Sequence, residues 1–350
     1  MDKTTLHYSP SFLSTSFPCD IDGLNTQKLY LLNGVPEQEK YILPEGVRIE
    51  GNRKEKGILI ELASSVMLEI PLQLINVRQG NGSANVVYSN TIRLEPRAQA
   101  KLIICDHTFS LDEFVTQSAF DIELAEGAQL EMVVMQNEHN RSQHRSDFVV
   151  SQASGSVLNA AIISLHGGKI ENFIKTKLQE QEAQCNVSGL FLADAEQHIT
   201  TNVFMQHLVP HCSSSQLFKG ILKNNAVGRF NGRIFVAKDA QKTEAYQANH
   251  NLLLDRTAKI YTQPQLEIYA DDVKCSHGAT IGRLNEDIFF YLRSRGIGRQ
   301  EALLLQQLGF ANDVLNKIPI VPLRERITTL VEKRLRGELS HCENCNIHCC

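Results

Sequence analysis

Short alternating apolar segments recur along the chain from about Val47 to Ile281, with almost no helical periodicity between them. They are rich in β-branched and aromatic residues and alternate with period two, as β-strands do. The segments are Ile58–Leu62, Met67–Ile70, Leu102–Cys105, Leu130–Met135, Phe148–Val150, Ile162–Leu165, Val187–Leu192, Gly232–Val236 and Gln265–Ile268. So many short strands predict a fold that is mainly β.

Small-polar turns separate these segments and repeat a loose phrase, in which an acid or Gly is followed by Ala and then by an amide or Lys. Glu126-Gly-Ala-Gln and Asp239-Ala-Gln-Lys are examples. A sandwich, a barrel and a β-solenoid are all compatible with the strand pattern. The return of one small unit favours the solenoid, in which each repeat stacks on its neighbours.

Helical periodicity begins after Gly282 and continues almost to the C-terminus. The pattern predicts four helices, with an N-cap at Asn285, a C-terminal cap at Gly296, stops at Gly309 and Pro319, and a new start at Pro322. We therefore divide the chain into a short N-terminal arm (1–46), a β core (47–282), a helical domain (283–338) and a Cys/His-rich tail (339–350).

Composition and missing motifs narrow the function. The net charge of −4 gives no reason to expect nucleic-acid binding. The first residues lack the apolar core of a signal peptide, and no apolar run approaches the length of a membrane span, so we expect a cytoplasmic protein. No phosphate-binding loop is present, which predicts that the chain itself binds no nucleotide. The nine cysteines are unevenly spread, and we read them as reduced thiols or metal ligands.

The strongest candidate site is Cys275-Ser-His277, at the end of a predicted strand and just before the helical region. Side chains two apart on a strand share a face, so a thiolate and an imidazole could together bind a soft or borderline metal if a second chain supplied the other ligands. The alternative is a small buried cysteine beside a histidine that caps a turn. Asp271 and Asp272 come just before them and are best explained as a solvated turn.

Two other clusters contain soft ligands. His207, His211 and Cys212 lie within six residues but have no matching second half, and chance spacing explains them. The tail offers Cys342, Cys345, Cys349 and Cys350 with two histidines, which would suit either a compact metal chelate or a disordered end with adventitious thiols.

The C-terminal half contains four distinctive motifs: Thr243-Glu-Ala-Tyr-Gln-Ala-Asn-His-Asn-Leu-Leu-Leu-Asp255, Pro264-Gln-Leu-Glu-Ile268, Asp271-Asp-Val-Lys-Cys-Ser-His-Gly-Ala-Thr280 and Phe290-Tyr-Leu-Arg-Ser-Arg-Gly-Ile297. In these motifs, and more weakly at Asn33-Gly-Val35 and Pro44-Glu-Gly-Val47, the chain resembles the SufB/SufD scaffold proteins of iron–sulfur cluster assembly. It implies a right-handed parallel β-helix followed by a small helical domain. The family usually has a longer helical N-terminal region, and the Cys-rich tail is not part of its pattern.

Two positions make the resemblance closer to SufD than to SufB. B-type chains have Glu after the motif histidine, where this chain has Gly278, and they have Cys in the following helix, where it has Leu292. The resemblance therefore implies a D-type subunit that pairs with a SufB-type partner through the β-helix. It also implies that His277, with Cys275 as its neighbour, lies where a transient iron–sulfur cluster or iron is held, and that residues 285–335 dock a SufC-type ATPase.

The resulting hypothesis is a scaffold subunit that is not an enzyme. One rival is a polysaccharide-active enzyme, because β-helices often serve as lyases and hydrolases. Those proteins are mostly secreted, which argues against this reading. The other rival is a self-contained metal-binding homodimer that uses the tail; a homodimer of the isolated chain also fits the main hypothesis.

Overall fold

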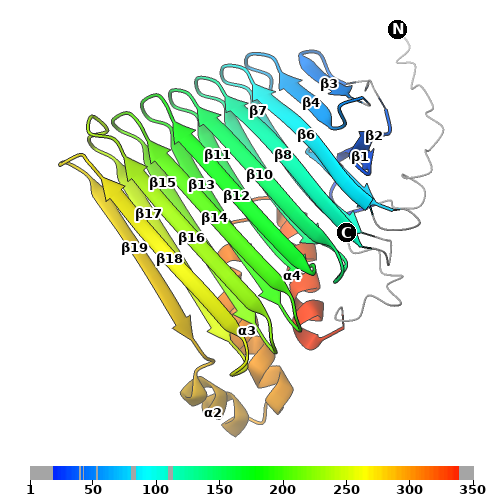
Figure 1. Ribbon diagram of the computed structural model, residues 1–350, viewed down its shortest axis with the longest axis vertical. Helices are drawn as coiled ribbons and strands as arrows, with labels where there is room; N and C mark the ends of the chain where they lie inside the picture. The colour runs from blue at the N-terminus through cyan, green and yellow to red at the C-terminus, as the bar shows by residue number, and fades with distance from the viewer. Residues whose placement is uncertain are drawn as a thin grey trace.

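The computed structural model describes residues 19–38, 41, 43–52, 54–79, 84–108 and 113–338. Two long sheets form a β-solenoid (Figure 1). From β4 onward, successive strands alternate between the sheets and each pairs with the strand two places along the chain. One sheet, which we call the helix-side sheet, contains β1 (Gln27–Leu32), β2 (Val35–Pro36), β5 (Leu72–Arg78), β7 (Gln99–Thr108), β9 (Gln129–Asn137), β11 (Val157–His166), β13 (Gln184–Ala193), β15 (Ser213–Leu222), β17 (Glu244–Leu253) and β19 (Lys274–Gly282).

The other sheet, which we call the open sheet, contains β3 (Val47–Gly51), β4 (Ile58–Leu62), β6 (Ala84–Leu94), β8 (Phe114–Leu124), β10 (Gln143–Gln152), β12 (Lys169–Leu178), β14 (His198–His207), β16 (Val227–Val236) and β18 (Lys259–Ile268). From β4 onward all its pairings are parallel, and the register runs without a shift from β10 to β18. The solenoid and mainly-β predictions are confirmed.

Burial explains why the two sheets have different sequence patterns. In the open sheet every second side chain points into the lumen between the sheets, so β10 and β14 alternate strictly between buried and less buried positions. The helix-side sheet is buried on both faces over much of its area, and β5 is buried at every position. A strand that is buried on both faces has no alternation of apolar and polar residues, so its sequence is a nearly continuous apolar run.

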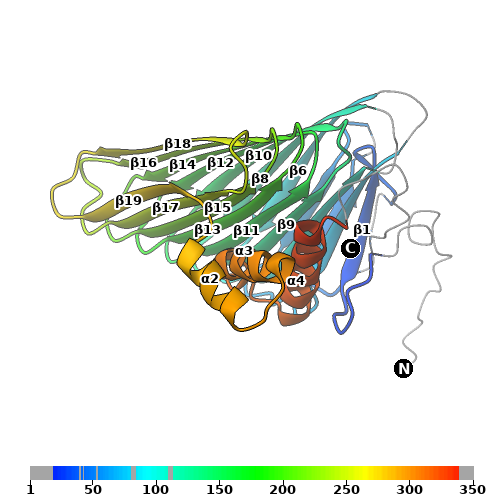
Figure 2. The same cartoon turned by 90° about the horizontal axis from the view of Figure 1, so that it is seen from below.

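Three helices follow the solenoid: α2 (Glu286–Ser294), α3 (Arg299–Leu315) and α4 (Val321–Arg336). Figure 2 shows α3 and α4 against the helix-side sheet, with the open sheet on the far side and uncovered. Their inner faces form a second apolar core with the outward side chains of that sheet, including Ile163 and Leu192. No helix in the described ranges is long and apolar enough to cross a membrane.

Two buried cations also fix the helices to the sheet. The Lys219 ammonium on β15 donates to the carbonyl oxygen of Phe310 at 2.9 Å and pairs with Asp313 on α3. The Arg334 guanidinium on α4 donates to the carbonyl oxygen of Leu165 at 3.1 Å. These contacts place the helices on the side of the solenoid, and within the described ranges no further strand covers its C-terminal end.

The helix boundaries partly correct the prediction. Asn285 caps α2 by accepting from two backbone N–H groups, and Gly296, at a φ of 83°, ends it. The predicted stop at Gly309 is wrong, because α3 runs from Arg299 to Leu315 as one helix. A single glycine costs an internal helix only about 1 kcal/mol, and the apolar contacts of α3 with the sheet outweigh that.

The strands are also longer than the sequence pattern predicts. Most described strands are about ten residues long, because inward-facing amide, hydroxyl and histidine side chains continue them beyond the apolar runs, as in β14. Met67–Ile70 forms only an isolated bridge, between Met67 and Gln99. Within the predicted N-terminal arm, β1 pairs in parallel with β5 and is part of the helix-side sheet.

Candidate functional site

The Cys275-Ser-His277 sequence lies at the open C-terminal end of the solenoid. It belongs to β19, whose only strand partner in the described part of the chain is β17. In that register Cys275 lies beside Ala245 and His277 beside Gln247, so both continue rows of side chains that point into the lumen. Their spacing of two therefore places them on one face, at the mouth of the solenoid.

The two candidate ligands differ in accessibility. His277 is exposed, whereas Cys275 is half-buried and packs against the apolar core of the lumen. Burial raises the pKa of the Cys275 thiol, an effect only partly offset by the backbone hydrogen bond at Ala245. Cysteine binds metals as the thiolate, so the raised pKa makes Cys275 a poorer donor in the isolated chain, and His277 is the more exposed of the two candidate ligands.

A pair of glutamines forms a polar floor beneath His277. Gln247 Nε2 donates to Gln216 Oε1 at 2.8 Å, one strand further in. A Cβ at Gly232 on the opposite sheet would come within 2.3 Å of Gln247 Nε2, so the glycine leaves room for the amide to cross the lumen. Gln247 Oε1 has no hydrogen-bond partner within the described ranges. The mouth therefore has a polar base that could hydrogen-bond an entering ligand or water.

Asp271 and Asp272 lie in the exposed turn before β19. Asp272 forms an ion pair with Lys242 and accepts the Lys242 backbone N–H at its carbonyl oxygen. Both carboxylates lie on the turn rather than in the mouth, which agrees with a solvated turn.

The His207, His211 and Cys212 cluster is dispersed by the fold. His207 is buried in the lumen, where its Nε2 lies 2.8 Å from Ser214 Oγ, and burial lowers its pKa to about 4. His211 is exposed in a turn at a φ of 62°, and the Cys212 thiol donates to the carbonyl oxygen of Glu180 at 3.2 Å. The three side chains do not converge on one point.

The nine cysteines divide into three groups. Cys105, Cys185, Cys212 and Cys275 are free thiols, and burial raises the pKa of both Cys105 and Cys185 to about 12. Cys19 is disulfide-bonded, so the expectation of a reduced thiol or metal ligand is wrong there. Cys342, Cys345, Cys349 and Cys350 of the tail lie outside the described residues.

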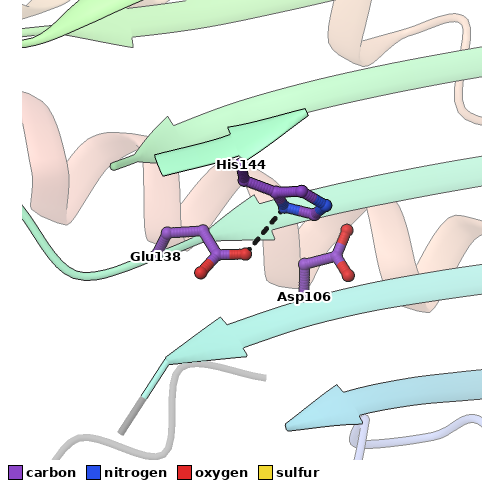
Figure 3. A group of neighbouring side chains, drawn as sticks. All are labelled: Asp106, Glu138 and His144. Carbon is purple, nitrogen blue, oxygen red and sulfur yellow. Dashed lines mark hydrogen bonds and ion pairs between the residues drawn. The ribbon is translucent and has the colours of Figure 1, made fainter. Parts of the chain in front are cut away.

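The structure also reveals a charged cluster that the sequence analysis did not identify. Asp106, Glu138 and His144 meet in the lumen near the N-terminal end, and their ligand-type atoms all lie within 4.8 Å of one another (Figure 3). His144 Nδ1 is 2.9 Å from Glu138 Oε1. All three residues are buried, and such a group is a candidate cation site.

The cation position in this cluster is already filled by Arg78. Its guanidinium lies 3.0 Å from Asp106 Oδ1 and 3.0 Å from Glu138 Oε1, and it also donates to the Tyr88 hydroxyl at 2.8 Å. Burial alone would raise the pKa of Glu138, but the Arg78 charge and the His144 contact outweigh it and hold that pKa below its usual range. The cluster is thus a charge-paired part of the solenoid core. Arg78 and Asp106 each follow an apolar run in the sequence, but nothing in the sequence connects them with Glu138 or His144.

Helix α2 presents a second exposed surface, next to the mouth in sequence. None of its residues is buried, and Ile288, Phe290 and Tyr291 expose large apolar side chains. A surface helix normally buries its apolar side. An unburied apolar helix is therefore a candidate surface for a partner protein.

Comparison with known proteins identifies the family of this chain. Residues 76–310 match the family model described as "SUF system FeS cluster assembly, SufBD core domain". The chain is 31% identical over 274 residues to the iron–sulfur cluster assembly protein SufD of Escherichia coli, covering 76% of this chain and 64% of that protein. It is 34% identical over 214 residues to a SufBD family protein of Synechocystis, covering 61% of this chain and 47% of the relative.

A third relative, a SufBD family protein of Mycobacterium leprae, is 26% identical over 290 residues, or 80% of this chain and 72% of the relative. The chain thus spans about half to two thirds of the first two relatives. The residues matched by the family model include the Arg78–Asp106–Glu138 cluster, the Cys275-Ser-His277 sequence and α2, and they end within α3. This chain belongs to the SufBD family of the SUF system for iron–sulfur cluster assembly.

Proposed function

We propose that this chain is a D-type scaffold subunit, without catalytic activity of its own, that contributes His277 to a site where an iron–sulfur cluster is assembled. The cluster or its iron is the cargo of this site, held transiently and then released. Cys275 is the neighbouring donor, provided that binding of a partner or of iron lowers the pKa of its thiol. Imidazole and thiolate are both suitable ligands for iron during assembly.

The observation that carries the proposal is the position of His277 at an unfinished end of the solenoid. Neither β18 nor β19 has a second strand neighbour in the described part of the chain. One imidazole and one half-buried thiol are too few ligands for a cluster. The site therefore needs donors from another chain placed against the same end.

We assign the missing donors to a SufB-type subunit that pairs with this end of the solenoid. In its absence, a second copy of this chain could occupy the same surface as a homodimer. A SufC-type ATPase would dock on residues 285–335, where α2 exposes its apolar side chains. A site shared between two chains can open when they separate, which suits the release of its cargo.

The direct test is anaerobic cluster assembly on the purified complex of this chain with SufB-type and SufC-type partners. His277→Ala should abolish most of the bound iron and acid-labile sulfide while leaving the subunits associated. Cys275→Ser should have a smaller effect, because Cys275 is half-buried. His211→Asn is the matched control, since His211 is exposed elsewhere and Asn tolerates its positive φ.

If the His277→Ala complex retained as much iron and sulfide as the wild-type complex, the assignment of His277 to the assembly site would be wrong. A variant without residues 341–350 separates the tail from the mouth, because loss of iron in that variant alone would assign binding to Cys342, Cys345, Cys349 and Cys350.

A further inference from the structure

The outer face of the open sheet concentrates positive charge in a chain whose net charge is −4. Over β10 to β18, the outward positions carry seven cations and three carboxylates. The cations are Arg145, Lys169, Lys175, Lys177, Arg229, Arg233 and Lys259, and the carboxylates are Asp147, Glu171 and Glu267. The net charge of −4, which gave no reason to expect nucleic-acid binding, does not reveal this local excess of cations.

Each carboxylate at an outward position of β10 to β18 is already paired with a cation on the same strands or their neighbours. Asp147 binds Arg145 at 2.8 Å, Glu171 binds Lys169 at 2.9 Å, and Glu267 binds Arg233 at 3.4 Å. The other four cations, Lys175, Lys177, Arg229 and Lys259, form no ion pair with any residue of the described ranges. The face therefore has uncompensated positive charge available to a partner.

The same face is hollowed into a groove of about 430 Å³ that crosses β10, β12, β14, β16 and β18. Lys175 and Arg233 lie on either side of Phe204 in one register row of this groove. In the next row, Asn231 Nδ2 donates to Asn202 Oδ1 at 2.8 Å. These amides give the floor further hydrogen-bonding groups.

Guanidinium groups cover the aromatic rings along the groove. The Arg145 guanidinium carbon lies 4.1 Å from the centre of the Phe173 ring, and that of Arg233 lies 3.8 Å from the centre of the Phe204 ring. Arg229 stacks on Tyr261 in the same way at 4.7 Å. Stacking holds the guanidinium groups flat along the groove. Arg145 and Arg233 also donate to Asp147 and Glu267, whereas Arg229 forms no ion pair within the described ranges and can donate to a partner's carboxylate.

We propose that this groove binds an acidic segment of a partner protein. Nucleic acid fits less well, because a duplex-binding protein typically neutralises about 6–10 phosphates and this face has fewer uncommitted cations. Bases would also need open ring faces on which to stack, and the guanidinium groups cover Phe173 and Phe204. An extended peptide with Asp or Glu side chains fits a shallow groove lined by amides and cations.

The test uses the full chain and a fluorescein-labelled peptide composed of Asp, Glu and Phe, with its Asn/Gln/Phe counterpart as the uncharged probe. Fluorescence anisotropy should show binding of the acidic peptide alone, weakening as salt rises. Lys175→Ser with Arg229→Ser should weaken binding about tenfold, the effect of losing two exposed charge contacts. Lys238→Ser with Lys317→Ser is the matched control, since both residues are exposed and lie off this face.

Three results would overturn the proposal: equal affinity of the acidic peptide for the two double variants, equal affinity of the chain for the charged and uncharged peptides, or tighter binding of a single-stranded oligonucleotide than of the acidic peptide. The groove variants should assemble clusters normally in the complex, because they lie away from the mouth. Loss of peptide binding therefore reports on the groove and not on His277.

Discussion

At the residue scale, the charges in the lumen show how a solenoid tolerates ionisable groups in its core. Arg78 is 1% exposed, yet it is ion-paired to Asp106 and Glu138 and hydrogen-bonded to Tyr88. An uncompensated charge in this position would be very costly, whereas a paired and hydrogen-bonded one is tolerated. The cluster is therefore sensitive to the loss of any single member.

We predict that Arg78→Met destabilises the protein by about 3–5 kcal/mol, because it leaves two buried carboxylates without their cation. Urea unfolding at pH 7.5 measures the effect. Arg145→Met is the control, since the Arg145–Asp147 pair is exposed and should contribute less than about 1 kcal/mol. Equal losses in the two variants would contradict the assignment of Arg78 as a buried charge partner.

The pH dependence of the Glu138 contribution gives a second measurement of the same cluster. The pKa of Glu138 is lowered in the folded state, so its charge stabilises the fold above its unfolded pKa of about 4.3. That contribution is lost as the pH falls from there through the lowered folded pKa. The stability difference between wild type and Glu138→Gln should thus be constant above pH about 5.5 and shrink at more acidic pH.

The sequence could suggest Cys275-Ser-His277 as a candidate site but could not suggest this cluster, because most members of the cluster lie far apart along the chain. The Cys-x-His spacing brings its two residues together within one strand. Arg78, Asp106 and Glu138 come from successive coils, and His144 follows Glu138 by six residues across the turn into β10. Only the stacking of the coils makes the four residues neighbours. Glu138 lies just beyond β9, where the sequence alone gives no sign that the chain still points inward.

At the element scale, α2 differs from α3 and α4 in having no buried residue. Its cap residues Asn285 and Gly296 could be read from the sequence because capping is local chemistry. The sequence could not show that α3 continues through Gly309, because the packing of α3 against the helix-side sheet decides this. Long strands such as β14 were missed for a similar reason, since their inward polar side chains interrupt the apolar pattern.

We predict that Phe290→Ser weakens docking of a SufC-type ATPase by more than tenfold without changing the melting temperature. Phe290 is 74% exposed, so it contributes little to the fold but offers a large apolar anchor to a partner. Isothermal titration calorimetry with the purified ATPase measures the change. Val87→Ser, at another exposed apolar residue, should leave the affinity unchanged; similar weakening by both variants would remove α2 from the docking surface.

At the scale of the whole molecule, the two ends of the solenoid are built differently. At the N-terminal end β2 and β3 pair antiparallel with β1 and β4 and are the outermost strands of their sheets. At the C-terminal end β18 and β19 are outermost, and Ile268, Tyr269 and Ile281 expose apolar side chains there. Exposed strand edges with apolar side chains are ready to pair with another chain.

This asymmetry predicts that partner pairing uses the C-terminal end. Ile281 is 51% exposed and lies in the same inward row as Asn251, so Ile281→Lys would put a charge into an interface without disturbing the lumen core. The variant should fail to form a heterodimer with a SufB-type subunit in sedimentation velocity experiments. Any homodimer of the isolated chain that uses this end should dissociate as well.

Met67→Lys is the matched control, because Met67 is equally apolar and exposed but lies toward the N-terminal end. It should pair with the SufB-type subunit as wild type does. If Ile281→Lys also paired normally while His277→Ala still lost the cluster, the partner would have to approach the mouth from the side of the solenoid. The two strand edges would then remain free in the complex, and the missing cluster ligands would have to come from a loop of the partner rather than from a strand aligned with β19.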